Sequence, residues 1–346
     1  MRGGEPGWMV RGHETPFSEH HAFLKSLDRV QHGGKLNVPS DVVVLLVQGL
    51  HTKAQRTTVG YFHAIEAALR LYGVPFLKSS VRTSGSIRKN AARIRKDIMN
   101  SNPNTRWVVY GHSKGAVDAV TALSLYPELL ARVLSVCSIQ GVHGGSPIAE
   151  ALGWTRLTQG MSNRNRHRDF LGGLGYTHEA AARTLCVVGS IVPATGHRNP
   201  TMQKTSKWIE RKHGRSSDGL VCVDDQWFPH CQRYIRLCDF NHMEGASDMK
   251  GARFLSSDVC LALLDMVFGT GQPPEPIPET ENFVLGRLVP RKLQPKNRVQ
   301  PVPYPTPSST VTKDGIAHVG YIRPQDHLKK NPLGRHKWFS IPWTQS

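Results

Sequence analysis

Short runs of apolar, often β-branched residues alternate with longer segments in which apolar positions recur every three or four residues, between about Asp41 and Phe268. The short runs predict strands that are buried on both faces, and the longer periods predict amphipathic helices. This alternation is typical of a parallel, doubly wound sheet with helices on both faces. The strands are expected at 42–47, 76–81, 106–110, 133–139, 184–189 and 233–237, and the main helices at 57–71, 86–100, 114–130 and 256–268.

Prolines divide the chain, because 13 of the 23 lie between Pro273 and Pro342 and favour extended backbone over helix. We therefore expect one large α/β domain over residues 38–271 and an irregular, Pro-rich, basic extension over 272–346. The first 37 residues are polar and predict a loosely attached lead-in with one short helix over 18–30. The segment 147–183 separates two predicted strands, and we expect it to form an inserted cap or lid.

The formal net charge is +18, with 44 Lys and Arg against 26 Asp and Glu in 346 residues. Such a charge makes nucleic acids, anionic membranes and acidic proteins candidate partners. The basic residues are spread over predicted helix faces and lack interleaved aromatic residues for base stacking. We therefore expect no specific nucleic-acid partner and retain an anionic lipid surface as a candidate.

The sequence also indicates a cellular compartment. No run of about 18 apolar residues occurs, and the first 17 residues carry four charges without an apolar stretch. Six cysteines in a chain of this length are not a disulfide framework. We therefore expect a cytoplasmic protein without a signal peptide. The cysteines and histidines between Cys222 and His242 lack C-x-x-C spacing, and we predict no metal and no cofactor.

A predicted strand runs directly into Gly111-His112-Ser113-Lys114-Gly115, and a helical pattern follows. The G-x-S-x-G pattern alone is common, and a glycine-rich turn without chemistry is the alternative interpretation. A strand, a tight turn and a helix around the serine are, however, the context of a nucleophile elbow. We therefore predict that Ser113 is a nucleophile.

A serine nucleophile requires a histidine that accepts its proton and a carboxylate that orients the histidine. Asp218 lies in an Asp-Gly turn after the fifth predicted strand, and His242 lies in the loop after the sixth. The chain order Ser113, Asp218, His242 agrees with this arrangement of the three roles. Asp224 and Asp225 remain alternatives for the carboxylate.

A tetrahedral intermediate requires two hydrogen-bond donors aimed at its oxyanion. We expect the backbone N–H of Lys114 to be one donor, because this residue follows the nucleophile. The second donor should come from the loop after the first predicted strand, where we favour Leu50. The neighbouring N–H groups of Gly49 and His51 are alternatives.

Substrate contacts are expected from His51 and His112, which flank the predicted site, and from Trp154 and Phe170 in the cap segment. This segment combines apolar residues with Arg156, Arg164, Arg166 and Arg168, and a cationic amphipathic cap suits a lid that meets a lipid surface. A few helices that close a small-ester pocket explain the pattern equally well. The length of the acyl chain therefore stays open.

Together these motifs resemble the bacterial triacylglycerol lipases and related esterases of the α/β-hydrolase fold. The resemblance covers residues 40–270 and is carried by Val47-Gln48-Gly49-Leu50, the motif at 111–115, His143-Gly144-Gly145-Ser146-Pro147-Ile148-Ala149, Ser217-Asp218-Gly219-Leu220-Val221 and Asn241-His242-Met243. It implies an α/β-hydrolase fold, a carboxylic ester or lipid substrate, and Ser113, Asp218 and His242 as nucleophile, acid and base.

The chain also departs from those lipases. They usually have His-Gly where this chain has Gln48-Gly49, and many bind a structural calcium ion near the acid and the base. Glu244 lies near the expected position, but a second calcium ligand is missing. Two functional classes follow from the sequence. One is a lipase-like or esterase-like serine hydrolase. The other is a catalytically idle protein of the same fold whose basic surface holds an anionic partner.

Overall fold

The computed structural model describes residues 17–50, 60–151, 177–192, 199–228, 231–269, 309–311 and 317–319. The chain divides into two units between Ile277 and Pro278, and each unit is described by itself. The second unit contributes an antiparallel pair of strands, β8 (Ser309–Val311) and β9 (Ala317–Val319). All other elements belong to the first unit.

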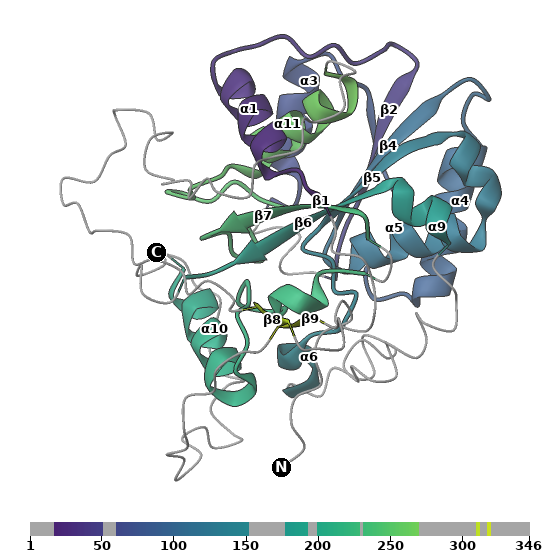
Figure 1. The fold of residues 1–346 in the computed structure, drawn as a ribbon. Helices are drawn as coiled ribbons and strands as arrows, with labels where there is room; N and C mark the ends of the chain where they lie inside the picture. Colours follow the sequence, from purple (N-terminus) through teal and green to yellow (C-terminus); the bar gives the residue numbers. More distant parts are fainter. Residues whose placement is uncertain are drawn as a thin grey trace. The chain divides into compact units, whose positions relative to one another are not determined.

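A seven-stranded sheet forms the centre of the first unit (Figure 1). Its strand order is β1-β7-β6-β5-β4-β2-β3, and all neighbouring strands are parallel. Its strands are β1 (Phe17–Ser18), β2 (Val42–Val47), β3 (Phe76–Lys78), β4 (Arg106–His112), β5 (Val133–Ile139), β6 (Thr184–Ser190) and β7 (Arg233–Cys238). The central strands are apolar and buried because helices cover both faces. The predicted parallel, doubly wound sheet is confirmed.

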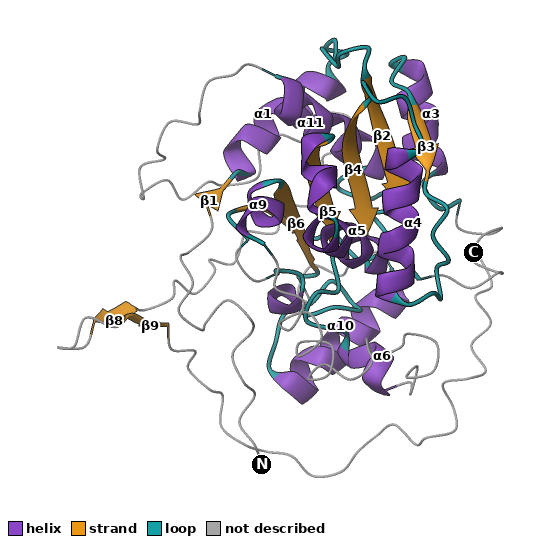
Figure 2. Cartoon of the chain, turned by 90° about the vertical axis from the view of Figure 1, so that its right-hand side faces the viewer, coloured by secondary structure: helices purple, strands orange, loops and turns teal. Residues whose placement is uncertain are grey.

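Helices cover both faces of this sheet (Figures 1 and 2). Helices α1 (His20–Gln31), α3 (His63–Leu71) and α11 (Ser256–Phe268) lie on one face. Helices α4 (Ile87–Met99), α5 (Lys114–Leu125) and α9 (His178–Ala182) lie on the other. The other helices in the described part of the chain are α6 (Pro147–Ala151) and α10 (Pro200–His213), with 3-10 turns at Pro127–Ala131 and Val223–Asp225. Within the described ranges, no helix has the length and apolar character needed to cross a membrane.

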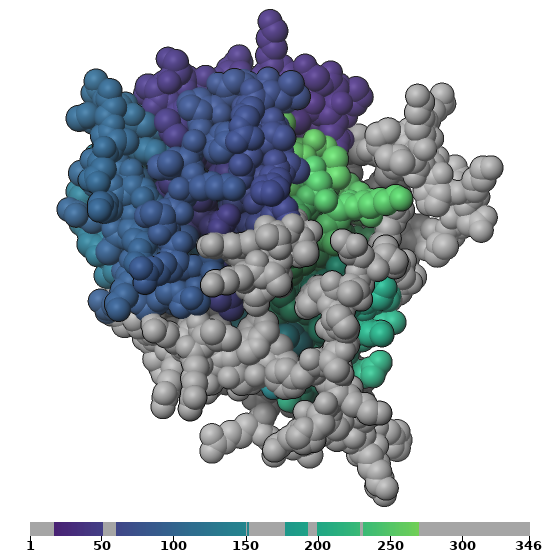
Figure 3. All heavy atoms as spheres, turned by 180° about the vertical axis from the view of Figure 1, so that it is seen from behind, coloured from purple at the N-terminus to yellow at the C-terminus, as the bar shows by residue number. Residues whose placement is uncertain are grey.

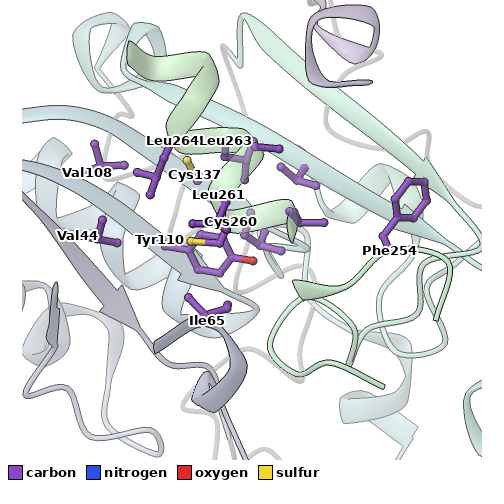
Figure 4. Packing of buried hydrophobic residues seen from close by; sticks show 14 of the residues in the cluster. Val44, Ile65, Val108, Tyr110, Cys137, Phe254, Cys260, Leu261, Leu263 and Leu264 are labelled. Atoms are coloured by element: carbon purple, nitrogen blue, oxygen red, sulfur yellow. The ribbon is translucent and has the colours of Figure 1, made fainter. Parts of the chain in front are cut away.

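Strand β4 divides its side chains between two hydrophobic cores, because successive residues of a strand point to opposite faces. Trp107 and Val109 join the core beneath α4 and α5, whereas Val108 and Tyr110 join the core beneath α1, α3 and α11. Figure 4 shows Tyr110 in this second core, next to residues of α11. On the face drawn in Figure 3, the blue surface of the α3 region adjoins the green surface of the α11 region.

The N-terminal segment differs from our expectation of loose attachment. Phe23, Leu24, Leu27 and Val30 of α1 are buried and pack in the core shared with α11. Their spacing gives the helix an apolar stripe, which explains why it docks on the domain. Strand β1 also pairs with β7 at the edge of the sheet. Residues 17–31 are therefore a structural part of the first unit.

Two helix boundaries differ from the predicted ones by more than two residues. Helix α5 ends at Leu125 rather than at residue 130, because Pro127 disfavours a helical conformation at Tyr126. Of the helix predicted at 57–71, residues 57–59 lie outside the described residues, and α3 begins at His63. Gly60 and Phe62 have φ angles of 58° and 64°, and this left-handed backbone cannot continue a helix.

Helix α10 was missed by the sequence analysis although its ends carry clear signals. Asn199 caps the first turn through a hydrogen bond from the N–H of Met202, and Pro200 occupies the first helical position. Gly214 ends the helix in a left-handed conformation. The polar sequence between these caps concealed the helix.

Candidate active site

The strand order reverses between β2 and β4, because β3 pairs with the outer edge of β2 whereas β4 to β7 extend on its other side. In open parallel sheets, ligands bind beyond the carboxyl ends of the strands at such a reversal. The loop that begins at Gln48 follows β2, and Ser113 follows β4. The topology therefore brings these two segments together at the expected position of a site.

Ser113 lies between β4 and α5 with a φ of 55° and a ψ of −123°. A positive φ is rare for a residue other than glycine, and here it turns the chain sharply from strand to helix. A Cβ atom at Gly111 would lie 2.8 Å from the Cα of Ala116, and one at Gly115 would overlap the carbonyl oxygen of Val47. Gly111 thus allows β4 and the first turn of α5 to approach each other closely, and Gly115 allows α5 to approach the end of β2.

The side chains of Ser113, Asp218 and His242 meet at this turn. Nε2 of His242 lies 2.9 Å from Oγ of Ser113, and Nδ1 of the same ring lies 2.7 Å from Oδ2 of Asp218. All three residues are more than nine-tenths buried. The structure therefore brings the predicted nucleophile, acid and base into one hydrogen-bonded chain.

The turn around Asp218 is built to hold its carboxylate. Oδ1 of Asp218 accepts the N–H groups of Leu220 at 2.9 Å and Val221 at 2.8 Å, while Oδ2 faces His242. Gly219 adopts a φ of 101°, which the predicted Asp-Gly turn allows. The N–H of His242 also donates to the carbonyl oxygen of Asp218 at 2.9 Å. Side chain and backbone thus both tie the acid loop to the histidine loop.

The two alternative carboxylates bind elsewhere. Arg215 donates to Oδ2 of Asp224 at 3.2 Å and to Oδ2 of Asp225 at 3.0 Å. Asp225 is fully buried in this ion pair, whereas Asp224 is about half exposed. The geometry favours Asp218 as the partner of His242.

Three N–H groups were considered as the second oxyanion donor, and the structure describes two of them. The N–H of Gly49 already donates to the hydroxyl of Tyr61 at 2.8 Å, so it is engaged inside the protein. Leu50 is half-buried directly beyond it, and His51 lies outside the described residues. Lys114 occupies the first helical position of α5, where an N–H has no acceptor within the helix. Leu50 and Lys114 therefore remain the proposed donors.

We predicted that His112 contacts the substrate, but the structure places its side chain inside the protein. Its side chain is almost completely buried. Nδ1 lies 2.5 Å from the hydroxyl of Tyr61, and Nε2 lies 2.8 Å from the carbonyl oxygen of His242. Because both ring nitrogens are engaged inside the protein, the ring is not available for a substrate. His112 shares the face of β4 that carries Tyr110, and the period of the strand would have indicated this.

Lys114 has a buried side chain that the sequence analysis did not foresee. Its Nζ lies 2.8 Å and 2.7 Å from the two carboxylate oxygens of Asp118, one helical turn later. Nδ2 of Asn90 in α4 donates to the same carboxylate at 2.7 Å. Burial raises the pKa of Asp118 to about 6, although Lys114 and Asn90 both act to lower it. This cluster lies directly behind the first turn of α5.

Three predicted substrate contacts, His51, Trp154 and Phe170, lie outside the described residues. Of the predicted cap at 147–183, the structure describes α6, α9 and the residues next to them. Tyr61 was not predicted at all. Its hydroxyl acts through residues distant in sequence, and no local pattern marks it.

Among the residues that the structure describes, no group of three or more His, Cys, Asp and Glu side chains is arranged to hold a metal ion. Glu244, near the position expected for a calcium ligand, accepts the N–H of Asn241 on Oε2 at 2.6 Å. It therefore braces the loop that carries His242. All six cysteines have free thiols.

No family model matches this sequence, and no curated protein matches it. Solved structures nevertheless share its fold. A metagenomic carboxyl esterase is 19% identical with a TM-score of 0.60, and the match covers 73% of this chain and 92% of the esterase. The propeptide form of a lipase from Bacillus licheniformis is 13% identical with a TM-score of 0.51, covering 70% of this chain and 54% of the lipase. At these identities the similarity establishes the fold, and the first unit has the α/β-hydrolase fold.

Proposed function

We propose that this protein is a serine hydrolase that cleaves carboxylic esters through an acyl-enzyme. One observation carries the proposal: the hydrogen-bonded chain from Ser113 through His242 to Asp218, set on a strained turn at the carboxyl end of β4. In a turn without a catalytic role, nothing would favour burying a histidine and a carboxylate in a hydrogen-bonded chain to the serine. Such a constellation is recognised by its geometry.

In the proposed reaction, Nε2 of His242 takes the proton of Ser113 while Oγ attacks the ester carbonyl carbon. Asp218 holds the proton on Nδ1 and stabilises the imidazolium that forms. His242 then gives the proton from Nε2 to the departing alkoxide, and the acyl group stays on Ser113. A water molecule deprotonated by the same nitrogen hydrolyses the acyl-enzyme and restores the serine.

The tetrahedral intermediates of both steps carry an oxyanion. We assign its stabilisation to the backbone N–H groups of Lys114 and Leu50. The N-terminus of α5 also presents the positive end of the helix dipole at this position.

The substrate class that we propose is a carboxylic ester, either small or lipid. The two proteins of similar fold are described as a carboxyl esterase and a lipase, which supports this class. The choice between short and long acyl chains is assigned to the cap segment 147–183, through Trp154 and Phe170. An anionic lipid surface is the proposed partner of the cap's arginines.

The test is covalent labelling with a fluorophosphonate probe, followed by hydrolysis of p-nitrophenyl esters from acetate to palmitate. The wild type should be labelled on Ser113, and Ser113→Ala should lose labelling and about a millionfold in kcat. The matched control is Ser124→Ala. Its half-buried hydroxyl donates to the carbonyl oxygen of Val120, one turn earlier in the same helix. Labelling that persists in Ser113→Ala, or a folded wild type that the probe does not label, would contradict the proposal.

A further inference from the structure

A short segment before α3 binds the two loops that flank Ser113. Gly60 and Phe62 have positive φ angles, and Phe62 is completely buried. The N–H of Phe62 donates to the carbonyl oxygen of Ala246 at 2.8 Å, in the loop that carries His242. The hydroxyl of Tyr61 accepts the N–H of Gly49 at 2.8 Å, in the loop after β2. The segment 60–62 therefore links the loop of the proposed base to the loop of the proposed oxyanion donor.

His112 extends this link, and its hydrogen bonds fix the position of each proton. The carbonyl oxygen of His242 can only accept, so Nε2 of His112 must donate to it at 2.8 Å. In a neutral ring Nδ1 is then an acceptor, and the Tyr61 hydroxyl must donate to it at 2.5 Å. The oxygen of that hydroxyl also accepts the N–H of Gly49. Every donor in the chain faces an acceptor, and one arrangement of protons satisfies all three bonds.

The buried environment preserves this arrangement. Burial, together with the nearby His242, holds the pKa of His112 well below its usual range. Burial also raises the pKa of the Tyr61 hydroxyl. The histidine thus stays neutral and the tyrosine stays protonated, as the hydrogen bonds require.

The position of the chain connects it to the proposed chemistry. A Cβ atom at Gly49 would lie 2.8 Å both from the Cβ of Ser113 and from the hydroxyl of Tyr61, so this backbone is packed between the two residues. Tyr110, on the same face of β4 as His112, donates to the carbonyl oxygen of Gly245 at 2.9 Å. Strand β4 thus fixes the histidine loop at two points. A shift of one loop would change the distance from His242 to Ser113 or the direction of the Leu50 N–H.

We propose that Tyr61 and His112 are positioning residues, which hold the oxyanion loop and the His242 loop in register with Ser113. This role rests on the proposed ester hydrolysis. Neither residue touches the substrate or donates a proton in the reaction. Their hydrogen bonds fix geometry that the transition state uses, so their loss acts on kcat rather than on substrate affinity.

Tyr61→Phe tests the role with little change in packing. The ring that lies 4.8 Å from Phe62 and 5.6 Å from His112 is kept, and only the hydroxyl is lost. We expect kcat for a p-nitrophenyl ester to fall about 10- to 100-fold, with KM changed less than about twofold. The rate constant for fluorophosphonate labelling should fall in parallel. Tyr126→Phe, a half-buried tyrosine at the end of α5, is the matched control and should retain wild-type kinetics.

Two substitutions of His112 test its two hydrogen bonds separately: the one to the Tyr61 hydroxyl and the one to the His242 carbonyl. His112→Asn places an amide near the position of Nδ1, so it can still accept from Tyr61 but loses the bond to the His242 carbonyl. His112→Gln places an amide near Nε2 and keeps that second bond. Each should retain more activity than His112→Leu, which loses both. This ranking also tests the proposal if Tyr61→Phe does not fold.

The outcomes separate the two proposals. A folded wild type that is neither labelled nor active would overturn the proposed hydrolysis. A wild type that is labelled and active, together with a folded Tyr61→Phe whose kcat is within twofold of it, would overturn the positioning role alone. An effect confined to KM, or equal losses in all three His112 variants, would overturn it as well.

Discussion

The two neighbours of Ser113 are both buried, yet they are held in opposite ways. His112 lies in a chain of neutral hydrogen bonds that joins Gly49, Tyr61 and the backbone of His242. Lys114 lies on the other side of the sheet, where its ammonium group forms an ion pair with Asp118. One neighbour thus connects loops that are distant in sequence, and the other connects the first turn of α5 to the next.

The two neighbours of Ser113 also differ in the free energy that their burial requires. A satisfied neutral chain requires little desolvation, and removing one link leaves a polar group unpaired at a cost of about 1 to 3 kcal/mol. A buried ion pair loses much of its attraction to desolvation, and a lone buried charge costs more. Lys114 also stands at the positive end of the α5 dipole, where a cation is unfavourable without the carboxylate of Asp118. Substitutions in the ion pair of Lys114 and Asp118 should therefore act mainly on the free energy of unfolding. Substitutions in the neutral chain of His112 and Tyr61 should act mainly on kcat.

Among the residues around Ser113, the largest effect on kcat is expected at the proposed acid, Asp218. Asp218→Asn should lower kcat about 10⁴-fold, because the amide favours the wrong tautomer of His242. The change leaves the bond from His112 to the backbone of His242 intact. Asp218→Asn therefore reports on the orientation of the His242 ring, whereas His112→Asn reports on the position of the loop that carries His242. Hydrolysis of a p-nitrophenyl ester measures both.

Asp224→Asn is the control for the acid. This half-exposed residue pairs with Arg215 in the same region of the chain, and its substitution should change kcat by no more than a few-fold. A damaging Asp224→Asn beside a mild Asp218→Asn would show that the acid has been assigned to the wrong residue.

The second prediction concerns the ionic neighbour. Asp118→Leu leaves the buried ammonium of Lys114 without its carboxylate, and the free energy of unfolding should fall by about 3 to 5 kcal/mol. The double variant Lys114→Met/Asp118→Leu replaces both charges with apolar groups of similar volume, and its stability should return close to that of the wild type. Urea unfolding followed by circular dichroism measures both. A double variant as unstable as the single one would show that the pair itself stabilises the fold.

The third prediction uses pH to sharpen the same comparison. Asp118 has a pKa of about 6 in the folded protein, against an ordinary value of about 3.9. Between these values the folded state holds a proton that the unfolded chain has released, so the free energy of unfolding rises as the pH falls. Acidification from pH 7 to pH 4 should therefore raise the stability of the wild type relative to the double variant. A protonated Asp118 can still accept hydrogen bonds from Lys114 and Asn90, which the leucine of Asp118→Leu cannot do, so loss of the charge by protonation differs from loss of the whole carboxyl group. An unchanged difference between the two proteins would refute this assignment.

Local patterns were sufficient to predict the fold and to single out Ser113, Asp218 and His242, the three side chains that the structure brings together after β4. Strands β2, β4, β5 and β6 have runs of mainly β-branched and apolar residues, and burial on both faces of a parallel sheet selects such runs. Strand β1 has two residues, too few to form a pattern. The Asp-Gly turn and the loop after β7 indicated Asp218 and His242 because turns at strand ends can present side chains. The sequence did not show that these side chains lie within hydrogen-bonding distance of one another and of Ser113; the structure does.

The supporting residues could not be predicted in the same way. The contribution of Tyr61 depends on where its hydroxyl lies in space, and Gly49, His112 and His242 are distant from it in sequence. The i, i+4 spacing of Lys114 and Asp118 permits an ion pair, but burial of that pair depends on α4 and its Asn90. Proximity in sequence to Ser113 suggested a substrate contact for His112, and the alternation of β4 sends its side chain elsewhere.

The smallest effect on stability is expected at an exposed ion pair. It serves as a reference for the buried pair of Lys114 and Asp118. Nε of Arg95 lies 2.5 Å from Oε1 of Glu128, with both side chains substantially exposed. Glu128→Gln removes this charge and leaves Arg95 stacked over the ring of Tyr126. Water and salt screen such a pair, so the urea midpoint should stay within the scatter of repeated measurements. Asp118→Leu should shift the same midpoint strongly, and added salt should leave that shift in place because the pair behind it is buried. If Glu128→Gln instead destabilised the fold as much as Asp118→Leu, burial would not explain the difference between the two pairs, and the contrast drawn between the two neighbours of Ser113 would lose its physical basis.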